Sequence, residues 1–219
     1  MHHKSQASAG TAPVETKGKV IRWARFYDLG TWFLSFGQAP GIRRMTIELA
    51  GIVEGARVLD VGCGTGTLTI AAMRRAGSTG EVHGIDPSAE MIAVARGKAA
   101  KAGVGAQFQT AAMENLPFPD GHFDLVLSSL MLHHLPPDVK RAGFAEVRRV
   151  LKPGGRFLAV DIADFGGFFG HIIGPLGLHK TEGKLGEAPA MLREAGFEDA
   201  ELGRTKYKPL WVVRATKAG

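Results

Sequence analysis

The strongest indication of the fold is the segment Val58-Leu59-Asp60-Val61-Gly62-Cys63-Gly64-Thr65-Gly66. Its apolar first half predicts a short buried strand over Arg57 to Val61, and its alternate glycines predict a tight turn into a helix. Glycines let a ligand approach the backbone, and the amides that open a helix favour a carboxylate or another anion. An ordinary strand-to-helix turn needs similar glycines, so this stretch by itself indicates a nucleotide-type site only weakly.

A second signal follows about twenty residues after Gly66, at the end of the next predicted strand, Glu81 to Asp86. An acidic side chain there can accept both ribose hydroxyl groups of an adenosine. Alternatively, Asp86 stabilises the N-terminus of the following helix through its dipole. A nicotinamide-dependent oxidoreductase has the same two features, but it needs a small residue where this chain has Thr67, and Asp60 would repel a pyrophosphate.

Outward from this stretch, strand and helix patterns alternate. We expect helices at 42–50, 67–75, 90–102, 137–151 and 188–195, and strands at 57–61, 81–86, 106–110, 123–128, 156–162, 200–204 and 211–215. Pro153-Gly154-Gly155 is interpreted as the stop signal of the fourth of these helices. This alternation predicts an α/β, Rossmann-like fold with a seven-stranded, mostly parallel sheet, helices on both faces and a ligand at the carboxyl ends of the strands.

The chain of 219 residues divides into three expected parts. Residues 1–19 are polar and interrupted by Gly and Pro, which predicts a disordered tail without the apolar core of a secretory signal. Residues 20–50 are rich in aromatic side chains and predict an N-terminal helical lid, and residues 51–219 form the Rossmann-like domain. No apolar run is long enough to span a bilayer, and Cys63 is the sole cysteine, so we expect a cytoplasmic protein.

The net charge of +6 permits contact with an anionic partner. However, the basic residues are scattered in small groups on predicted helices, so we expect a solvated surface and no nucleic-acid partner. The pair His133-His134 has no Asp, Glu or Cys at metal-ligand spacing beside it, and no metal site is predicted. The sequence carries no signal for an oligomeric state.

Four segments together resemble one enzyme family. They are VLDVGCGTG (58–66), GIDPSAEMI (84–92), MENLPFPDGHFDLVLSSLMLHHL (113–135) and LKPGGRF (151–157). In this order they resemble the class I S-adenosylmethionine (SAM)-dependent methyltransferases, above all the type 11 group that includes ubiquinone/menaquinone and phospholipid methyltransferases. The resemblance covers roughly residues 27–157 and implies SAM as the cofactor.

The resemblance also implies roles for individual residues. The methionine part of SAM would lie along Gly62, Gly64 and Gly66, with Asp60 near its ammonium group and Ser128 and Ser129 beside it. Asp86 would hold the ribose, and Met91, Met113 and Glu114 would contact the adenine. Tyr27 would close over the cofactor. One departure is Ala112, which stands where the group often has an Asp that bonds the adenine amine. We expect weaker SAM binding from this loss, by about 0.5–1.5 kcal/mol.

Methyl transfer needs alignment above all, and a base only where the acceptor must lose a proton. Tyr27, His133 and His171 are the base candidates. The acceptor is expected to be a small molecule, and the apolar, Gly-rich segment Phe165 to Leu178 favours a hydrophobic or lipid-like one, or contact with a membrane surface. Two alternatives stay open: a SAM-fold binding or membrane-associated module without catalysis, and the NAD(P)-dependent oxidoreductase.

Overall fold

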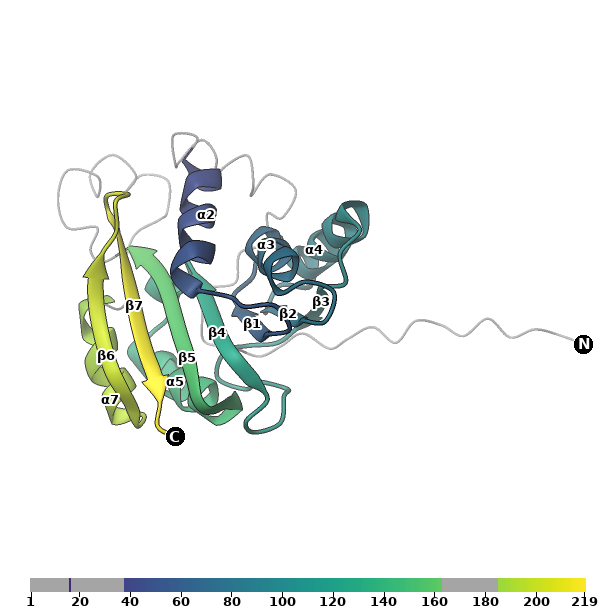
Figure 1. The fold of residues 1–219 in the computed structure, drawn as a ribbon. Helices are drawn as coiled ribbons and strands as arrows, with labels where there is room; N and C mark the ends of the chain where they lie inside the picture. The colour runs from purple at the N-terminus through teal and green to yellow at the C-terminus, as the bar shows by residue number, and fades with distance from the viewer. Residues whose placement is uncertain (1–15, 17–37, 163–184) are drawn as a thin grey trace, which may run out of the picture.

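The computed structural model describes Thr16 and residues 38–162 and 185–219 of the chain (Figure 1). In order, the elements are α2 (Ala39–Ala50), β1 (Arg57–Val61), α3 (Thr67–Ala76), β2 (Glu81–Asp86), α4 (Ala89–Ala102), β3 (Gln107–Thr110), β4 (Phe123–Ser129), the 3-10 turn η1 (Leu132–His134), α5 (Pro137–Val150), β5 (Leu151–Ile162), the 3-10 turn η3 (Leu185–Glu187), α7 (Ala188–Glu194), β6 (Phe197–Arg204) and β7 (Leu210–Lys217).

The strands form one seven-stranded sheet in the order β3-β2-β1-β4-β5-β7-β6. Neighbouring strands run parallel except at β7, which is antiparallel to both β5 and β6. The strand order reverses between β1 and β4, and in such sheets a ligand binds at this switch point, beyond the carboxyl ends of the strands. The predicted α/β, Rossmann-like fold is confirmed.

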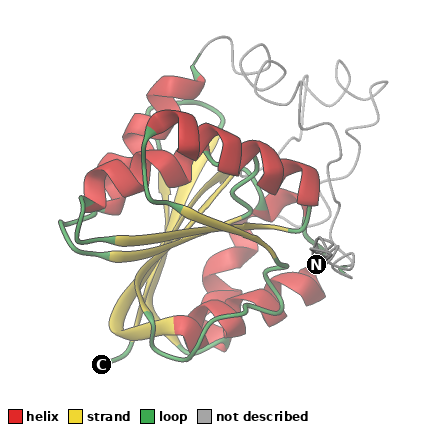
Figure 2. Ribbon diagram, turned by 90° about the vertical axis from the view of Figure 1, so that its right-hand side faces the viewer, coloured by secondary structure: helices red, strands yellow, loops and turns green. Residues whose placement is uncertain are grey.

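Helices cover both faces of the sheet (Figure 2). On one face, α2 and α3 pack over β1, where Met45 and Ala72 join the apolar cluster of Val58. On the other face, α5 packs against the cluster of Leu59, which includes Phe144. Because both faces are covered, the central strands are almost continuously apolar, as the sequence of β1 and β4 indicated.

One expected boundary is wrong. Pro153-Gly154-Gly155 does not end the helix α5, which stops at Val150, and β5 begins directly with Leu151. The two glycines lie inside β5 as a bulge: Phe123 pairs with Leu151, but Leu125 pairs with Arg156. Gly154 has a φ of 72°, a left-handed conformation that favours glycine. The tertiary pairing of Leu151 therefore overrides the local stop signal.

The remaining elements lie close to their expected positions. The last two strands are longer than expected, because Phe197 is buried and already pairs with Lys217. The helix α2 begins at Ala39 instead of residue 42, with Pro40 in its first turn, where proline is tolerated. Apart from Thr16, the expected tail (1–19) lies outside the described residues, as does the expected lid (20–50) up to residue 37. Within the described ranges, no helix combines the length and the apolar character needed to cross a membrane.

Candidate functional site

The glycine loop joins β1 to α3 at the switch point of the sheet. Gly62, Gly64 and Gly66 have φ values of 73°, 53° and 76°, which other residues rarely adopt. The amides of Gly62 and Cys63 both donate to the carbonyl of Ile85 at 2.9 Å, which ties the loop to β2. A Cβ atom on Gly66 would lie within 3.0 Å of Phe108 and Ala95 side-chain atoms. The loop thus has one conformation, set by its glycines and by β2.

Asp86 links this loop to the start of α4. One carboxylate oxygen of Asp86, Oδ2, accepts a hydrogen bond from the Gly64 amide at 3.0 Å, and the other, Oδ1, accepts from the Ser88 amide at 2.9 Å. Burial raises the pKa of the Asp86 carboxyl, and the two amides oppose that rise because they stabilise the charged form. An acceptor group is therefore fixed at the carboxyl end of β2, where the sequence predicted it.

Asp60 lies behind the loop. Its side chain is buried and accepts a hydrogen bond from the Thr69 hydroxyl on α3 at 2.7 Å. Burial raises the pKa of the Asp60 carboxyl to about 7; the bond from Thr69 opposes the rise, and the nearby charge of Asp86 adds to it. A carboxyl in this state changes its charge near neutral pH, so its protonation responds to any charge placed in the loop.

A narrow cavity opens beside the loop. Its lining comes from the loop, the end of β2, the first turn of α4, the segments after β3 and β4, and Thr16. The lining residues are Thr16, Val61, Gly62, Gly64, Asp86, Pro87, Met91, Ala111, Ala112, Met113, Glu114, Leu130, Met131, His134 and Leu135. The structure therefore gathers six of the predicted cofactor residues, Gly62, Gly64, Asp86, Met91, Met113 and Glu114, around one space. The other four, Asp60, Gly66, Ser128 and Ser129, do not line it.

The two serines end β4, next to β1 and β5. The hydroxyl of Ser128 is buried and has no hydrogen-bond partner among the described residues. A buried polar group without a partner is costly, and such groups in native proteins call for an explanation. Ser128 therefore stands out as a hydroxyl next to the switch point whose partner the described chain does not supply.

Sequence reasoning missed the segment that follows β4. Leu130 adopts a φ of 54°, a strained conformation for a residue with a branched side chain, and such outliers gather at functional sites. Its neighbour Met131 lies over Gly62, where a Cβ atom would come within 2.4 Å of the Met131 side chain. Their place in the chain could have indicated this role, since Leu130 and Met131 directly follow a parallel strand at the ligand-binding edge of the sheet.

The base candidate His133 lies in η1. Its Nδ1 atom is 2.5 Å from a carboxylate oxygen of Asp161 on β5, and its backbone amide donates to the other oxygen at 3.2 Å. Both side chains are almost completely buried. In the tautomer in which Nδ1 carries the proton, this contact orients the imidazole ring toward Asp161. His133 does not line the cavity beside the glycine loop, whereas its neighbour His134 does. The other two candidates, Tyr27 and His171, lie outside the described residues.

A wider hollow lies elsewhere, between α2 and α3. Its lining includes Arg43, Arg44 and Arg75 and none of the predicted site residues. Because ligands of this fold bind at the carboxyl ends of the strands, the narrow cavity beside the glycine loop is the candidate site.

The central part of the chain is similar to known methyltransferases. Residues 58–155 match the family model described as a methyltransferase domain. The ubiquinone/menaquinone biosynthesis C-methyltransferase UbiE of Pseudomonas aeruginosa is 42% identical over 139 residues, which are 63% of this chain and 54% of that protein. The match thus spans about half the length of the curated relative.

Solved structures agree on the fold. A SAM-dependent methyltransferase from Aquifex aeolicus superimposes with a TM-score of 0.66 at 23% identity, covering 80% of this chain and 88% of that one. The geranyl diphosphate C-methyltransferase from Streptomyces coelicolor superimposes with a TM-score of 0.68 at 14% identity, covering 82% of this chain and 79% of that one.

Proposed function

We propose that this chain, whose residues 58–155 match a methyltransferase domain, is a class I methyltransferase of the UbiE-like group and transfers a methyl group from SAM to a small, hydrophobic acceptor. The observation that carries the proposal is the junction of the glycine loop with Asp86. A loop open to a ligand on its glycine side and a fixed carboxylate at the end of the next strand together suit the methionine and ribose parts of one molecule. SAM supplies an activated methyl group on a positively charged sulfur.

The residues around the cavity suit SAM by their chemistry. Gly62 and Gly64 leave room for a ligand at the backbone, and Asp86 offers a carboxylate to the ribose hydroxyls. Met91 and Met113 provide apolar contacts for an adenine. Gly66 shapes the loop, and Glu114, whose Oε1 accepts a hydrogen bond from the Thr16 hydroxyl at 2.5 Å, borders the adenine side. We propose that Asp60, which lies behind the loop, balances the ammonium charge, and that Ser128 and Ser129 border the methionine part.

Ala112 also lines the cavity, but its side chain cannot form a hydrogen bond with the adenine. Ala112 is 3% exposed and lines the cavity beside Met113. Its methyl group offers apolar contact where a carboxylate in related enzymes would accept from the adenine amine. The proposal therefore includes a cofactor held chiefly at its ribose and methionine parts.

We propose a quinone-like acceptor, because the curated relative is a ubiquinone/menaquinone C-methyltransferase. Methylation of a ring carbon of a hydroquinone breaks the sulfur–methyl bond of SAM, forms one carbon–carbon bond and releases the proton of that carbon. SAM leaves as the neutral thioether S-adenosylhomocysteine. His133, which is held by Asp161 and lies next to the cavity-lining His134, is the proposed acceptor of that proton. We further propose that an N-terminal lid (residues 20–50) and the apolar segment 165–178 cover such an acceptor, and that Tyr27 and His171 contact it. A hydrophobic acceptor of this kind would also bring the protein into peripheral contact with a membrane surface.

The test uses the full chain, labelled SAM and a demethylated hydroquinone with a short isoprenoid tail. We expect methylated product, identified by mass spectrometry, and at least a tenfold loss of turnover at limiting SAM in Asp86→Ala. A chain that binds SAM by calorimetry but methylates neither this acceptor nor any component of a cell extract is a binding module without catalysis. A chain that binds NADPH in place of SAM overturns the proposal.

A further inference from the structure

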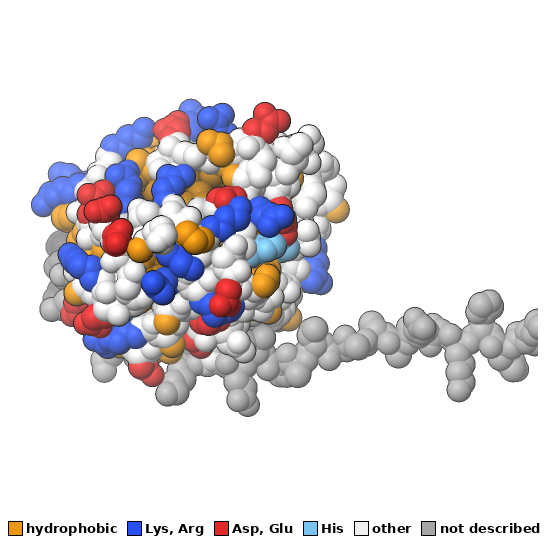
Figure 3. Space-filling view, turned by 60° about the horizontal axis from the view of Figure 1, so that its bottom comes forward, with side chains coloured by type: hydrophobic (Ala, Val, Ile, Leu, Met, Phe, Trp, Pro, Cys, Tyr) orange, Lys and Arg blue, Asp and Glu red, His pale blue; other side chains and the backbone are white. Residues whose placement is uncertain are grey.

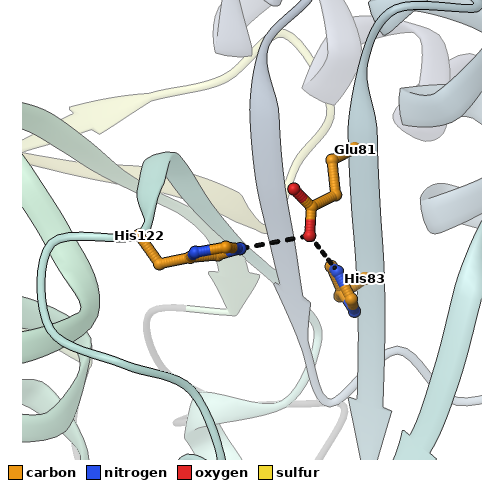
Figure 4. Close-up of side chains that lie close together, drawn as sticks. All are labelled: Glu81, His83 and His122. Atoms are coloured by element: carbon orange, nitrogen blue, oxygen red, sulfur yellow. Dashed lines mark hydrogen bonds and ion pairs between the residues drawn. The ribbon is translucent and has the colours of Figure 1, made fainter.

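A second group of functional side chains gathers at the opposite end of the sheet. Glu81 and His83 lie two residues apart at the start of β2, so their side chains share one face of the strand. His122 directly precedes β4 and reaches the same place from the other side of β1. The Nε2 atoms of His83 and His122 lie 2.8 Å and 3.1 Å from the same Glu81 oxygen, Oε1 (Figure 4).

Aromatic contacts hold the two imidazole rings in these positions. The His83 ring meets the Phe118 ring edge-on, with ring centroids 5.1 Å apart. The His122 ring packs edge-on against Phe123 at 4.7 Å and lies nearly parallel to Phe118 at 6.5 Å. Two nitrogen atoms are therefore directed at one point by packing that does not depend on a ligand, which lowers the entropic cost of binding.

The carboxylate is held by a separate contact. Glu81 Oε2 accepts an ion-pair bond from Arg57 Nε at 3.2 Å, which leaves Oε1 facing the histidines. The backbone amide of Arg57 in turn donates to Asp124 at 2.8 Å. Carboxylates that bind metals are commonly hydrogen-bonded on their other oxygen in this way, which orients the ligand.

The three side chains are accessible. Their exposed fractions are 31% for Glu81, 13% for His83 and 21% for His122, so an ion can enter and water can complete its coordination. Figure 3, which brings this end of the molecule forward, shows histidine surface beside basic and acidic side chains. In the part of the chain that the structure describes, this is the one group of three His, Cys, Asp or Glu residues whose potential ligand atoms all lie within 4.8 Å of one another.

We propose that Glu81, His83 and His122 bind a zinc ion. Two imidazole nitrogens and one carboxylate oxygen are ligands that zinc prefers, and water would occupy the fourth position. At zinc–ligand distances of about 2.0–2.1 Å, tetrahedral geometry separates the ligand atoms by about 3.3 Å. The present separations of 2.8 Å and 3.1 Å need only a small opening, together with a shift of each Nε2 proton to Nδ1.

The ion would fasten β2 to the segment before β4 across the intervening strand β1. It lies at the amino ends of the parallel strands, whereas the glycine loop lies at their carboxyl ends, so the site is structural or regulatory and takes no part in methyl transfer. Sequence reasoning predicted no metal site because it judged His133-His134 alone. His122 is brought to Glu81 and His83 only by the order of the strands.

The test is zinc titration of the full chain after removal of metals by a chelator. Because His2 and His3 near the N-terminus can bind metals themselves, all proteins carry His2→Ala and His3→Ala. We expect one equivalent of zinc by calorimetry, a rise of the melting temperature by several degrees with zinc, and visible absorption typical of four-coordinate cobalt when Co²⁺ replaces it.

Three variants define the ligands. His122→Gln and Glu81→Gln should each weaken zinc binding at least tenfold and abolish the rise in melting temperature. Glu201→Gln is the matched control, since Glu201 is also a strand glutamate paired with an arginine, Arg214, and it should bind zinc as the parent does. Circular dichroism checks each fold, and if His122→Gln does not fold, Glu81→Gln and X-ray absorption of the parent protein decide. Absence of binding at tens of micromolar zinc, or equal affinity in all variants, overturns the proposal.

Discussion

Binding of SAM should release a proton from Asp60. Burial raises the pKa of this carboxyl from its ordinary value of 3.8 to about 7. A shift of three pKa units corresponds to at most about 4 kcal/mol of differential stabilisation of the neutral form. If the ammonium group of SAM binds near Asp60, its positive charge favours the carboxylate and lowers the pKa. At pH 7, where about half of the unbound molecules carry this proton, binding then releases about half a proton.

Because binding releases a proton, the affinity for SAM should increase with pH. At one pH unit or more below 7, almost every unbound molecule has Asp60 protonated. SAM affinity should therefore rise by up to about tenfold per pH unit toward pH 7 and become constant above it. The stability of the chain without SAM should change with pH in the opposite direction, because the pKa of Asp60 is higher in the folded state than in the unfolded state. Its unfolded state loses the proton near pH 4 and its folded state only near pH 7. The contribution of Asp60 to the free energy of unfolding is therefore largest below pH 4 and falls as pH rises to 7.

The assay is calorimetry of SAM binding at pH 7 in buffers of different ionisation enthalpy. The observed enthalpy should become more exothermic in the buffer that releases more heat on protonation, and Asp60→Asn should remove this dependence. Asp124→Asn is the control, since Asp124 pairs with Lys152 at the other end of the sheet. A buffer-independent enthalpy, or the same dependence in Asp60→Asn, would refute the assignment of Asp60 to the ammonium group.

Substitutions of Asp86, Ala112 and Arg149 test three other contacts. Asp86→Ala should weaken SAM binding by about 1.5–3 kcal/mol in calorimetry, because it removes a charged acceptor from the ribose and from the Gly64 amide; unchanged affinity would exclude Asp86 as the ribose acceptor. Ala112→Asp should tighten SAM binding by about 0.5–1.5 kcal/mol through a bond to the adenine amine, and no gain would show that the amine lies elsewhere. Arg149→Ala should lower the free energy of unfolding by about 2–3 kcal/mol in urea at pH 7, since Arg149 bonds Glu146 and two backbone carbonyls. The pKa of Glu146 is lowered chiefly by its bond to Arg149, so this loss should shrink as the pH falls below the unfolded value of about 4.5, and a loss that is equal at pH 3 and pH 7 would contradict the reasoning.

The sheet could be predicted from the sequence because its central strands are short apolar runs that end at turn residues. Arg57–Val61 and Glu81–Asp86 lie where the pattern placed them. The errors have a common physical cause, namely pairing with a distant strand. Leu151 and Phe197 extend β5 and β6 beyond their local patterns because each is buried against a neighbour that the sequence does not identify. Local propensity gave way to tertiary pairing at both positions.

The same distinction explains which site residues could be predicted. The glycine loop and Asp86 belong to consecutive strand-to-helix turns, so chain order alone brings them together at one edge. The pair of His133 and Asp161 depends instead on β4 lying next to β5. Spacing along the chain predicts contacts between consecutive strand-to-helix turns. It does not predict contacts that depend on the order of the strands in the sheet, because no single segment determines that order.

The two proposed sites share β1 and can nevertheless be tested separately. At its amino end, Arg57 bonds Glu81, and near its carboxyl end Asp60 bonds Thr69. The zinc ligands and the residues that line the cavity have no member in common, and they lie at opposite ends of the strands, so we expect changes at the two sites to act independently. Loss of zinc should therefore lower the melting temperature without altering SAM affinity, whereas Asp86→Ala should alter SAM affinity without altering zinc affinity. Should both affinities change in either experiment, the strand would couple the two ends of the sheet.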